Sequence, residues 1–353
     1  MNREKGMLNV GILGVTGYTG IELLRLLQSH THIKVKSVFT ASYAGQAIAE
    51  VYPHLQHQTS LQGEKLNLDE ITQNCDLVFM ALPHGHAIEL IPPLLAAGKK
   101  IIDLGADFRL KNQSDYQHWY QHPAAPETLL QQAVYGLPEK GEKENIKNAN
   151  LIANPGCYPT ASILATLPAL KADLIDPDDL VFDAKSGLSG AGRTLSLNTH
   201  YCEASENVYP YQIAGAHRHT PEIEQELSLI ANKKIIIQFT PHLVPMTRGL
   251  LVTSYLKLKK LISKEEIYKI YKEIYHKEPF IRLCDHIPQV KHVKGSNFCD
   301  IGIQIDARTQ RLIVVSVIDN LIKGAAGQAI QNMNLMYQFP ENFGLNSNMV
   351  MYP

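Results

Sequence analysis

Residues 8–40 alternate between strand, glycine-rich loop, helix and strand. Residues 8–14 are apolar and predict a buried strand, residues 19–29 carry apolar side chains at helical spacing, and residues 34–40 predict a second strand. The loop before the helix reads GILGVTGYTG at residues 11–20. Glycines three residues apart let the backbone turn tightly and approach a pyrophosphate, whose charge the helix N-terminus stabilises. This arrangement predicts a βαβ unit that binds a dinucleotide.

The alternation continues through a strand at residues 75–82, a helix at 84–97 and a strand at 100–104, so we expect a doubly wound parallel sheet of the Rossmann type. After residue 157 a helix extends to about residue 171. Helices at 220–230 and 263–275 then separate short β-rich runs, which are residues 180–185, 234–240, 250–258, 280–283, 298–305 and 311–318. We therefore expect an α/β chain whose second domain is of α+β type with a mostly antiparallel sheet.

Two domains also agree with the chain length, because 353 residues are too many for one ordinary core. Residues 320–337 have small and apolar side chains at helical spacing. This helix is compatible with packing in either domain.

The end of the second strand distinguishes between the two nicotinamide dinucleotides. A site specific for NAD(H) usually ends this strand with Asp or Glu, which binds the ribose 2′-hydroxyl. Here the strand ends in Thr40-Ala41-Ser42, without a carboxylate to repel a 2′-phosphate and with two hydroxyls that can donate to one. We therefore expect NADP(H). The expected contacts are Thr40, Ser42 and the loop residues Gly14, Thr16, Gly17, Tyr18, Thr19 and Gly20.

Cys157 lies in the run NPGCYPT at residues 154–160, where a strand-like stretch ends and a helix-like stretch begins. Backbone N–H groups of a first helical turn and the positive end of the helix dipole stabilise a thiolate at such a position. The alternative is a buried cysteine that acts as a small apolar side chain. A nicotinamide together with a nucleophilic cysteine indicates one reaction class, in which an acyl group is carried as a thioester and reduced by hydride to an aldehyde.

A histidine is the expected acid/base for such a reaction, and residues 216–223, AHRHTPEI, supply two at a helix start. We expect Thr220 as the helix N-cap, with Glu222 placed to accept a hydrogen bond from the His219 ring. This favours His219 as the acid/base and His217 as a substrate contact. A structural or capping role and metal binding are the alternatives for the pair, but no third metal-ligand pattern accompanies it, and we expect no metal.

The composition restricts the partners. The net charge is −1, without a basic block or an acidic tail, which argues against nucleic acid and anionic membranes and leaves a small-molecule substrate. No stretch approaches the ~18 consecutive apolar residues of a membrane span. The five cysteines are widely spaced and form no CxxC pair, which argues against a disulfide framework or a thiolate zinc site. We expect a soluble, cytoplasmic protein.

The motifs taken together resemble a known family, the N-acetyl-gamma-glutamyl-phosphate reductases, which form the arginine-biosynthesis branch of the aspartate-semialdehyde dehydrogenase superfamily. The motifs that carry the resemblance are GVTGYTG at residues 14–20, NPGCYPT at 154–160, SGLSGAGR at 186–193, HRHTPEI at 217–223 and PMTRG at 245–249. They occur in the family's order, and the resemblance extends from residue 8 to about residue 337.

The resemblance implies an NADP-binding Rossmann domain of residues 1–156 and 320–353 and a catalytic α+β domain of residues 157–319. It further implies NADPH as the hydride donor and a homo-oligomer, either a dimer or a tetramer, built through the sheet of the second domain.

The resemblance also assigns residues. It places the nucleophile on Cys157 and the acid/base on the pair His217 and His219. A substrate with an acyl phosphate, an α-carboxylate and an acetamido group needs cationic and polar anchors. The candidates for substrate binding are Arg109, Arg193, Arg248, Asn154 and Ser186, and Gly190 joins the cofactor-binding candidates.

The expected activity is the NADPH-dependent reduction of N-acetyl-L-glutamyl 5-phosphate to N-acetyl-L-glutamate 5-semialdehyde and phosphate. Within the same class, the alternative is the homologous aminoadipyl-phosphate reductase of lysine biosynthesis, because one methylene changes binding by only ~1 to 3 kcal/mol. From a different class, the alternative is a non-catalytic nucleotide-sensing Rossmann protein, which has no need of a thiol at a helix start.

Overall fold

The computed structural model describes residues 7–345, which form two compact units. Unit 1 extends up to Pro138, continues from Glu142 to Pro155 and includes the segment that begins at Ala325. Unit 2 contains Glu139–Gly141 and Gly156–Gly324. Each unit is built on one seven-stranded sheet. Within residues 7–345, no helix is long and apolar enough to cross a membrane.

Unit 1 is a doubly wound α/β unit. Its sheet has the strand order β3-β2-β1-β4-β5-β7-β6, and all neighbouring strands are parallel. The strands are β1 Leu8–Leu13, β2 Ile33–Phe39, β3 Gly63–Glu64, β4 Leu77–Met80, β5 Lys100–Asp103, β6 Val134–Tyr135 and β7 Leu151–Ala153. The helices are α1 Tyr18–Leu27, α2 Ile48–Val51, α3 Leu68–Asn74, α4 Ala87–Ala96, α5 Gln113–Tyr120, α6 Glu127–Gln132, α7 Lys143–Asn148 and α12 Gly327–Met336.

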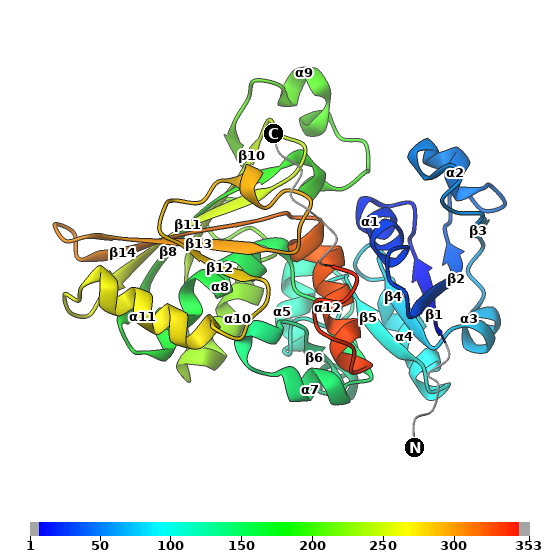
Figure 1. Ribbon diagram of the computed structural model, residues 1–353, viewed down its shortest axis with the longest axis horizontal. Helices are drawn as coiled ribbons and strands as arrows, with labels where there is room; N and C mark the ends of the chain where they lie inside the picture. Colours follow the sequence, from blue (N-terminus) through cyan, green and yellow to red (C-terminus); the bar gives the residue numbers. More distant parts are fainter. Residues whose placement is uncertain (1–6, 346–353) are drawn as a thin grey trace. The chain divides into compact units, whose positions relative to one another are not determined.

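The central strands of this sheet are apolar because both of their faces are covered. Every residue of β4 is buried, and in β1 only Asn9 is partly exposed. Helix α12 returns from the far end of the chain and packs beside α1, where the side chains of His30 and Asn334 form a hydrogen bond of 3.0 Å (Figure 1).

Unit 2 is an α+β unit with the strand order β12-β13-β14-β11-β8-β10-β9. The pairs β8–β10 and β12–β13 are parallel, and the other four pairs are antiparallel. The strands are β8 Ile175–Gly187, β9 Tyr209–Pro210, β10 Gln238–Val244, β11 Leu250–Leu258, β12 Ile281–Cys284, β13 Cys299–Asp306 and β14 Arg311–Ile318. The helices are α8 Cys157–Lys171, α9 Tyr201–Ala204, α10 Thr220–Ala231 and α11 Lys264–Tyr275.

Helix α8 lies at the centre of unit 2, and all of its residues except the first and the last are buried. It packs against β11 and β14 and against α10 and α11, and Figure 1 shows the three helices on one face of the sheet. Tyr271 and Tyr275 of α11 each donate a hydrogen bond of 2.7 Å to a backbone carbonyl of α8. Because α8 is held on several sides, its first residue has a fixed position.

The predicted fold class is confirmed, since one sheet is parallel and the other mostly antiparallel. The predicted bounds are confirmed for α8, β11 and β14. The strand predicted at 180–185 extends over Ile175–Gly187, and the strand predicted at 234–240 begins only at Gln238. The helix predicted at 320–337 begins with a π-helical turn, Ile322–Ala326, before α12.

Candidate active site

The glycine loop of unit 1 connects β1 to α1 and depends on two close backbone approaches. Gly14 has φ +78°, and a Cβ at this position would lie 2.2 Å from the carbonyl oxygen of Ala81. A Cβ at Gly20 would lie 2.2 Å from the carbonyl oxygen of Gly14. These two glycines therefore let the loop fold against the end of β4 and the start of its own helix.

The start of α1 fits an anionic group such as a pyrophosphate. Its N-cap is Gly17, which has no side chain to bond the first N–H groups, and the first turn carries no acidic side chain. The backbone N–H groups of Tyr18, Thr19 and Gly20 belong to this turn, in which N–H groups have no intrahelical acceptor. The helix dipole adds a positive potential at the same place.

The two hydroxyls expected near a 2′-phosphate have different surroundings. Thr40 is buried, and its Oγ1 shares a hydrogen bond of 2.9 Å with Oγ1 of Thr16. Ser42 is exposed. Thr40 and Thr16 thus fix the loop to the end of β2, whereas Ser42 is accessible to solvent, and its contact with a cofactor stays a prediction.

Cys157 is the first residue of α8 and is half-buried, with Gly156 as the helix N-cap. Gly324 of the π-helical turn packs against it, because a Cβ at Gly324 would lie 2.6 Å from the Cβ of Cys157. The thiol therefore lies at the N-terminus of a buried helix, where the helix dipole favours a thiolate.

Glu222 connects α10 to the turn that carries Cys157. Its carboxylate is fully buried and accepts a hydrogen bond of 2.8 Å from the backbone N–H of Gly156. Helix α10 begins at Thr220 with His219 as its N-cap, so the predicted N-cap is wrong by one residue. The reason is that His219 already has helical backbone angles, φ −82° and ψ −10°. The hydrogen bond from the His219 ring to Glu222 stays a prediction.

The two histidines lie in an aromatic enclosure that includes Tyr158, the residue after the cysteine. The ring of His217 is 5.5 Å from Tyr158, 5.3 Å from Tyr211 and 5.3 Å from Phe239, measured between centroids. The His219 ring is 5.0 Å from His217 and 5.9 Å from Tyr158. Unit 2 thus brings together all four predicted catalytic residues, Cys157, His217, His219 and Glu222.

Burial distinguishes the two histidines. His217 is 7% exposed, and its burial, with a further contribution from the nearby Arg218 charge, lowers the pKa of its ring to about 3. At neutral pH His217 is therefore uncharged and a weak base. This favours His219 as the group that exchanges protons.

Two of the predicted substrate-binding residues belong to unit 1. Arg109 is mostly buried, and its guanidinium donates hydrogen bonds of 2.8 Å to the backbone carbonyls of Asn154 and Leu104. The Asn154 side chain donates to the carbonyl of Ala325 at 3.1 Å and accepts from Asn332 at 3.1 Å. Both residues therefore order the segment that leads to the cysteine, and a role in substrate binding stays a prediction.

The other candidates belong to unit 2. Ser186 is buried near the end of β8, and a Cβ at Gly190 would lie 2.7 Å from its Oγ. Arg193 is exposed. Arg248 lies 3.3 Å from the buried carboxylate of Asp319 and so already has an acidic partner. Arg193 is thus the more exposed of these two arginines, and its role in substrate binding stays a prediction.

Sequence reasoning missed three residues of this site. Tyr158 follows the cysteine directly, so its position in the NPGCYPT run was a usable signal. Tyr211 and Gly324 had none, because their contacts with His217 and Cys157 depend on how distant segments fold back.

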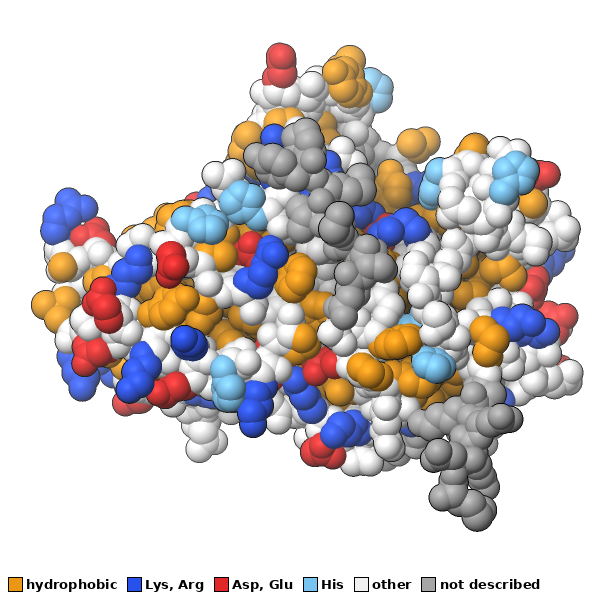
Figure 2. Space-filling model, in the orientation of Figure 1, with side chains coloured by type: hydrophobic (Ala, Val, Ile, Leu, Met, Phe, Trp, Pro, Cys, Tyr) orange, Lys and Arg blue, Asp and Glu red, His pale blue; other side chains and the backbone are white. Residues whose placement is uncertain are grey.

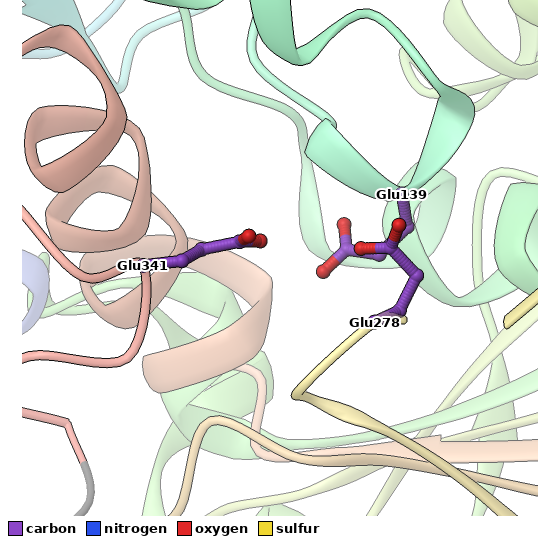
Figure 3. A group of neighbouring side chains, drawn as sticks. All are labelled: Glu139, Glu278 and Glu341. Atoms are coloured by element: carbon purple, nitrogen blue, oxygen red, sulfur yellow. The ribbon is translucent and has the colours of Figure 1, made fainter. Parts of the chain in front are cut away.

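Three carboxylates, Glu139, Glu278 and Glu341, are drawn in Figure 3. In unit 2, carboxylate oxygens of Glu139 and Glu278 lie within 4.8 Å of each other, and Glu139 forms a fully buried ion pair of 2.6 Å with Lys323. In unit 1, Glu341 forms an ion pair of 2.8 Å with Lys143. Since Glu139 and Glu341 have lysine partners, their charges are balanced by the protein itself.

Two protein families match different parts of the chain. The family described as "Semialdehyde dehydrogenase, NAD binding domain" matches residues 9–149, and the family described as "Semialdehyde dehydrogenase, dimerisation domain" matches residues 157–320. An N-acetyl-gamma-glutamyl-phosphate reductase of Symbiobacterium thermophilum is 51% identical over 98% of this chain and 99% of the relative. A reductase of the same name from Desulforudis audaxviator is 50% identical over 96% of this chain and 98% of the relative.

Solved structures show the same fold at low sequence identity. Aspartate semialdehyde dehydrogenase II of Vibrio cholerae, in complex with ASA, has a TM-score of 0.72 and 19% identity over 94% of this chain and 98% of that chain. The aspartate semialdehyde dehydrogenase of Candida albicans, solved with NADP, has a TM-score of 0.70 and 16% identity over 96% of this chain and 100% of that chain.

Proposed function

Because the chain belongs to the N-acetyl-gamma-glutamyl-phosphate reductase family, we propose that it reduces N-acetyl-L-glutamyl 5-phosphate to N-acetyl-L-glutamate 5-semialdehyde and phosphate. NADPH is the hydride donor, and the reaction belongs to arginine biosynthesis. The observation that carries this function is the placement of Cys157 at the first position of the buried helix α8, between Gly156, which is bonded to Glu222, and Tyr158, which contacts both histidine rings.

Cys157 is the nucleophile. His219 takes the thiol proton, the thiolate attacks the acyl carbonyl, and the same proton passes to the departing phosphate. The acyl group is then held as a thioester on Cys157. NADPH, when bound, supplies the hydride that reduces this thioester. The tetrahedral oxyanion that results collapses to the aldehyde and releases the Cys157 thiolate, which His219 protonates again with a proton from solvent.

The cofactor is bound by the first turn of α1 and the end of β2. The N–H groups of this turn hold the pyrophosphate, and Ser42 donates to the 2′-phosphate. The buried Thr16–Thr40 hydroxyl pair keeps the two segments in register.

The substrate phosphate and carboxylate are held by arginines, for which we propose Arg109 and Arg193. Planar guanidinium groups match both anions. The guanidinium of Arg109 donates hydrogen bonds to two neutral backbone carbonyls. The side chain of Arg193 is exposed.

The two units have different functions in this proposal. Unit 1, with the C-terminal helix α12, binds the cofactor, and unit 2 carries the chemistry and the contacts of a homo-oligomer. The family description of residues 157–320 as a dimerisation domain supports this division. We place the enzyme in the cytoplasm, as is expected for an NADPH-dependent biosynthetic reductase.

The reverse reaction tests the function. With N-acetyl-L-glutamate 5-semialdehyde, phosphate and NADP⁺, the protein should form NADPH, which is followed by its absorbance. Cys157→Ser should lower kcat by roughly 10³-fold or more while NADPH still binds, because serine is a poor acyl carrier and the cofactor residues lie elsewhere. The matched control is Cys202→Ser, since Cys202 is exposed in α9.

Other outcomes identify the alternatives. Faster turnover with the semialdehyde that is one carbon longer would assign the protein to the aminoadipyl branch. NADPH binding without turnover of either semialdehyde would indicate a nucleotide sensor. If Cys157→Ser kept more than about a tenth of the activity, the thioester mechanism would be wrong.

A further inference from the structure

A series of hydrogen bonds fixes the tautomer of His217. The backbone N–H of His219 donates to Nδ1 of His217 at 3.0 Å. A ring nitrogen that accepts a hydrogen bond carries no proton, so the neutral ring of His217 has its proton on Nε2. Nε2 lies 3.3 Å from the hydroxyl of Tyr211. Nε2–H therefore donates, and the Tyr211 oxygen accepts.

The series continues in one direction to β10. The Tyr211 hydroxyl donates to the hydroxyl of Tyr158 at 3.3 Å, and Tyr158 donates to the backbone carbonyl of His242 at 3.3 Å. A carbonyl oxygen can only accept, so every proton in the series has a defined position. Tyr158 and His217 are buried, which makes an unpaired donor or acceptor costly there.

The backbone around Tyr211 holds its hydroxyl in this series. The N–H of Tyr211 donates to the carbonyl of Pro241 in β10 at 3.1 Å. After it, the chain turns back toward His217 through Gln212 at φ +47° and Ala214 at φ +58°. Non-glycine residues with such angles are strained, and strain of this kind persists where the surrounding structure compensates for it.

We propose that Tyr211 is a positioning residue, which fixes the His217 ring and through it the backbone of His219 at the start of α10. His219 is the N-cap of α10, and its N–H is held by the His217 ring. Without the Tyr211 hydroxyl, the buried Nε2–H loses its acceptor. Rotation of the His217 ring toward another acceptor then becomes favourable. Such a rotation breaks the hydrogen bond that Nδ1 accepts from the His219 N–H.

The state of the His217 ring can be measured without substrate. Histidine side chains labelled with ¹⁵N report their tautomer in long-range ¹H–¹⁵N spectra, and the spectrum of His217→Asn identifies the His217 signals. The wild-type protein should show one neutral tautomer with the proton on Nε2. Tyr211→Phe should show a second tautomer or exchange-broadened signals. Tyr209→Phe is the matched control, because its hydroxyl donates to the carbonyl of Asn198 and takes no part in the series.

The kinetic measurement rests on the proposed function. Tyr211→Phe should lower kcat roughly tenfold, as for one lost hydrogen bond to a buried group, and should also raise KM, because the His217 ring that it releases is a predicted substrate contact. The double variant Tyr211→Phe/His217→Asn should be no slower than His217→Asn alone, because Tyr211 acts only through the His217 ring.

Three results would overturn the proposal: an unchanged single tautomer in Tyr211→Phe, an altered tautomer with wild-type kcat, or a loss as large as that of Cys157→Ser with the tautomer intact. The last result would assign the hydroxyl to the chemistry itself. If the wild-type protein turned over no semialdehyde, the proposed function would fail, and the spectra would still decide whether Tyr211 fixes the ring.

Discussion

Asp103, at the end of β5, is a carboxyl whose pKa is determined mainly by burial. The side chain is fully buried, Oδ1 accepts a hydrogen bond of 2.9 Å from the N–H of Gly105, and Oδ2 has no hydrogen-bond partner among the described residues. Burial, together with the nearby Asp107, raises the pKa of Asp103 from 3.8 to about 7. The nearby Arg109 charge lowers this pKa but does not offset the effect of burial.

This pKa predicts how Asp103 affects stability. Between pH 3.8 and about 7, Asp103 binds more protons in the folded state than in the unfolded state. Its contribution to the free energy of unfolding therefore falls as the pH rises through this window and is constant above it. Asp103→Asn cannot ionise. Its free energy of unfolding relative to the wild type should therefore rise with pH, by at most ~1.4 kcal/mol per unit. Urea unfolding at several pH values between 4 and 8 measures this difference, and a difference independent of pH would contradict the prediction.

Ser42 is the residue that should determine cofactor preference. Its exposed position after β2 is where NAD-specific sites carry an acidic residue. Ser42→Asp should reduce kcat/KM with NADPH about tenfold relative to NADH, because a carboxylate repels the 2′-phosphate. Ser42→Asn has a side chain of the same size as Asp without the charge and should keep the preference. Steady-state rates with both cofactors measure it, and equal use of NADPH and NADH by the wild type would show that Ser42 is not the determinant.

At the level of residues, the sequence predicts local chemistry better than contacts between distant segments. Cys157 at a helix start and the histidines near α10 follow from neighbouring letters and capping rules. The neutral state of His217 does not, because it depends on rings supplied by Tyr211 and Phe239, which only the folded chain brings together.

At the level of elements, the turn between β1 and α1 depends on the space around Gly14. Gly98, between α4 and β5, has a similar φ of +75° but no atom within 4 Å of an added Cβ, whereas at Gly14 the carbonyl of Ala81 would be 2.2 Å away. Gly98→Ala should therefore cost only the backbone strain of about 1–2 kcal/mol. Gly14→Ala adds a clash with backbone that has no room to yield.

The two alanine variants should differ in two measurements. Gly14→Ala should lower the unfolding temperature by more than Gly98→Ala and should also weaken NADPH binding, because relief of the clash moves the loop that we propose as the pyrophosphate site. Thermal unfolding and a fluorescence titration with NADPH measure these effects. Equal stability and equal affinity in the two variants would show that the loop tolerates a side chain at Gly14.

The predicted elements were most accurate where turn residues mark both ends of an apolar run. Helix α8 follows Pro155-Gly156, and β11 follows Gly249, which has φ +112°. The run at 234–237 contains three isoleucines and predicts a strand, but it lies outside the sheet, and the N–H of Ile237 donates to the side chain of Glu224. Apolar composition alone cannot distinguish a strand from a segment that packs beside a helix.

At the scale of the whole molecule, positive and negative side chains are nearly balanced, with 33 Lys and Arg against 34 Asp and Glu. Figure 2 shows blue and red side chains interspersed over α11, at the left of this face, as the net charge of −1 leads one to expect. Interspersed charges do not create the strong positive potential that attracts nucleic acid or anionic lipid. The homo-oligomer proposed above would therefore be assembled without a large single-sign patch on this face, and an apolar surface is the candidate for its contacts.

The sheet of unit 2 offers such a surface on the face opposite α8. Ser316 of β14 faces α8, since its hydroxyl donates to the carbonyl of Ala161, so the neighbouring odd-numbered residues of β14 lie on the other face. Val181, Tyr255 and Ile313 form a row on that face across three paired strands, and all three are half-buried in the single chain. A row of partly exposed apolar side chains in the middle of a sheet is typical of an oligomer interface.

Ile313→Asp should dissociate the homo-oligomer that we propose, because it would place a charge in the centre of this row, where desolvation without a partner costs several kcal/mol. Ile236→Asp is the matched control: Ile236 is 66% exposed and lies in the segment before β10, outside the sheet. Sedimentation velocity should give the wild type and Ile236→Asp as the same oligomer and Ile313→Asp as a smaller species. Loss of the oligomer in both variants, or in neither, would place the contact between copies on another surface of unit 2.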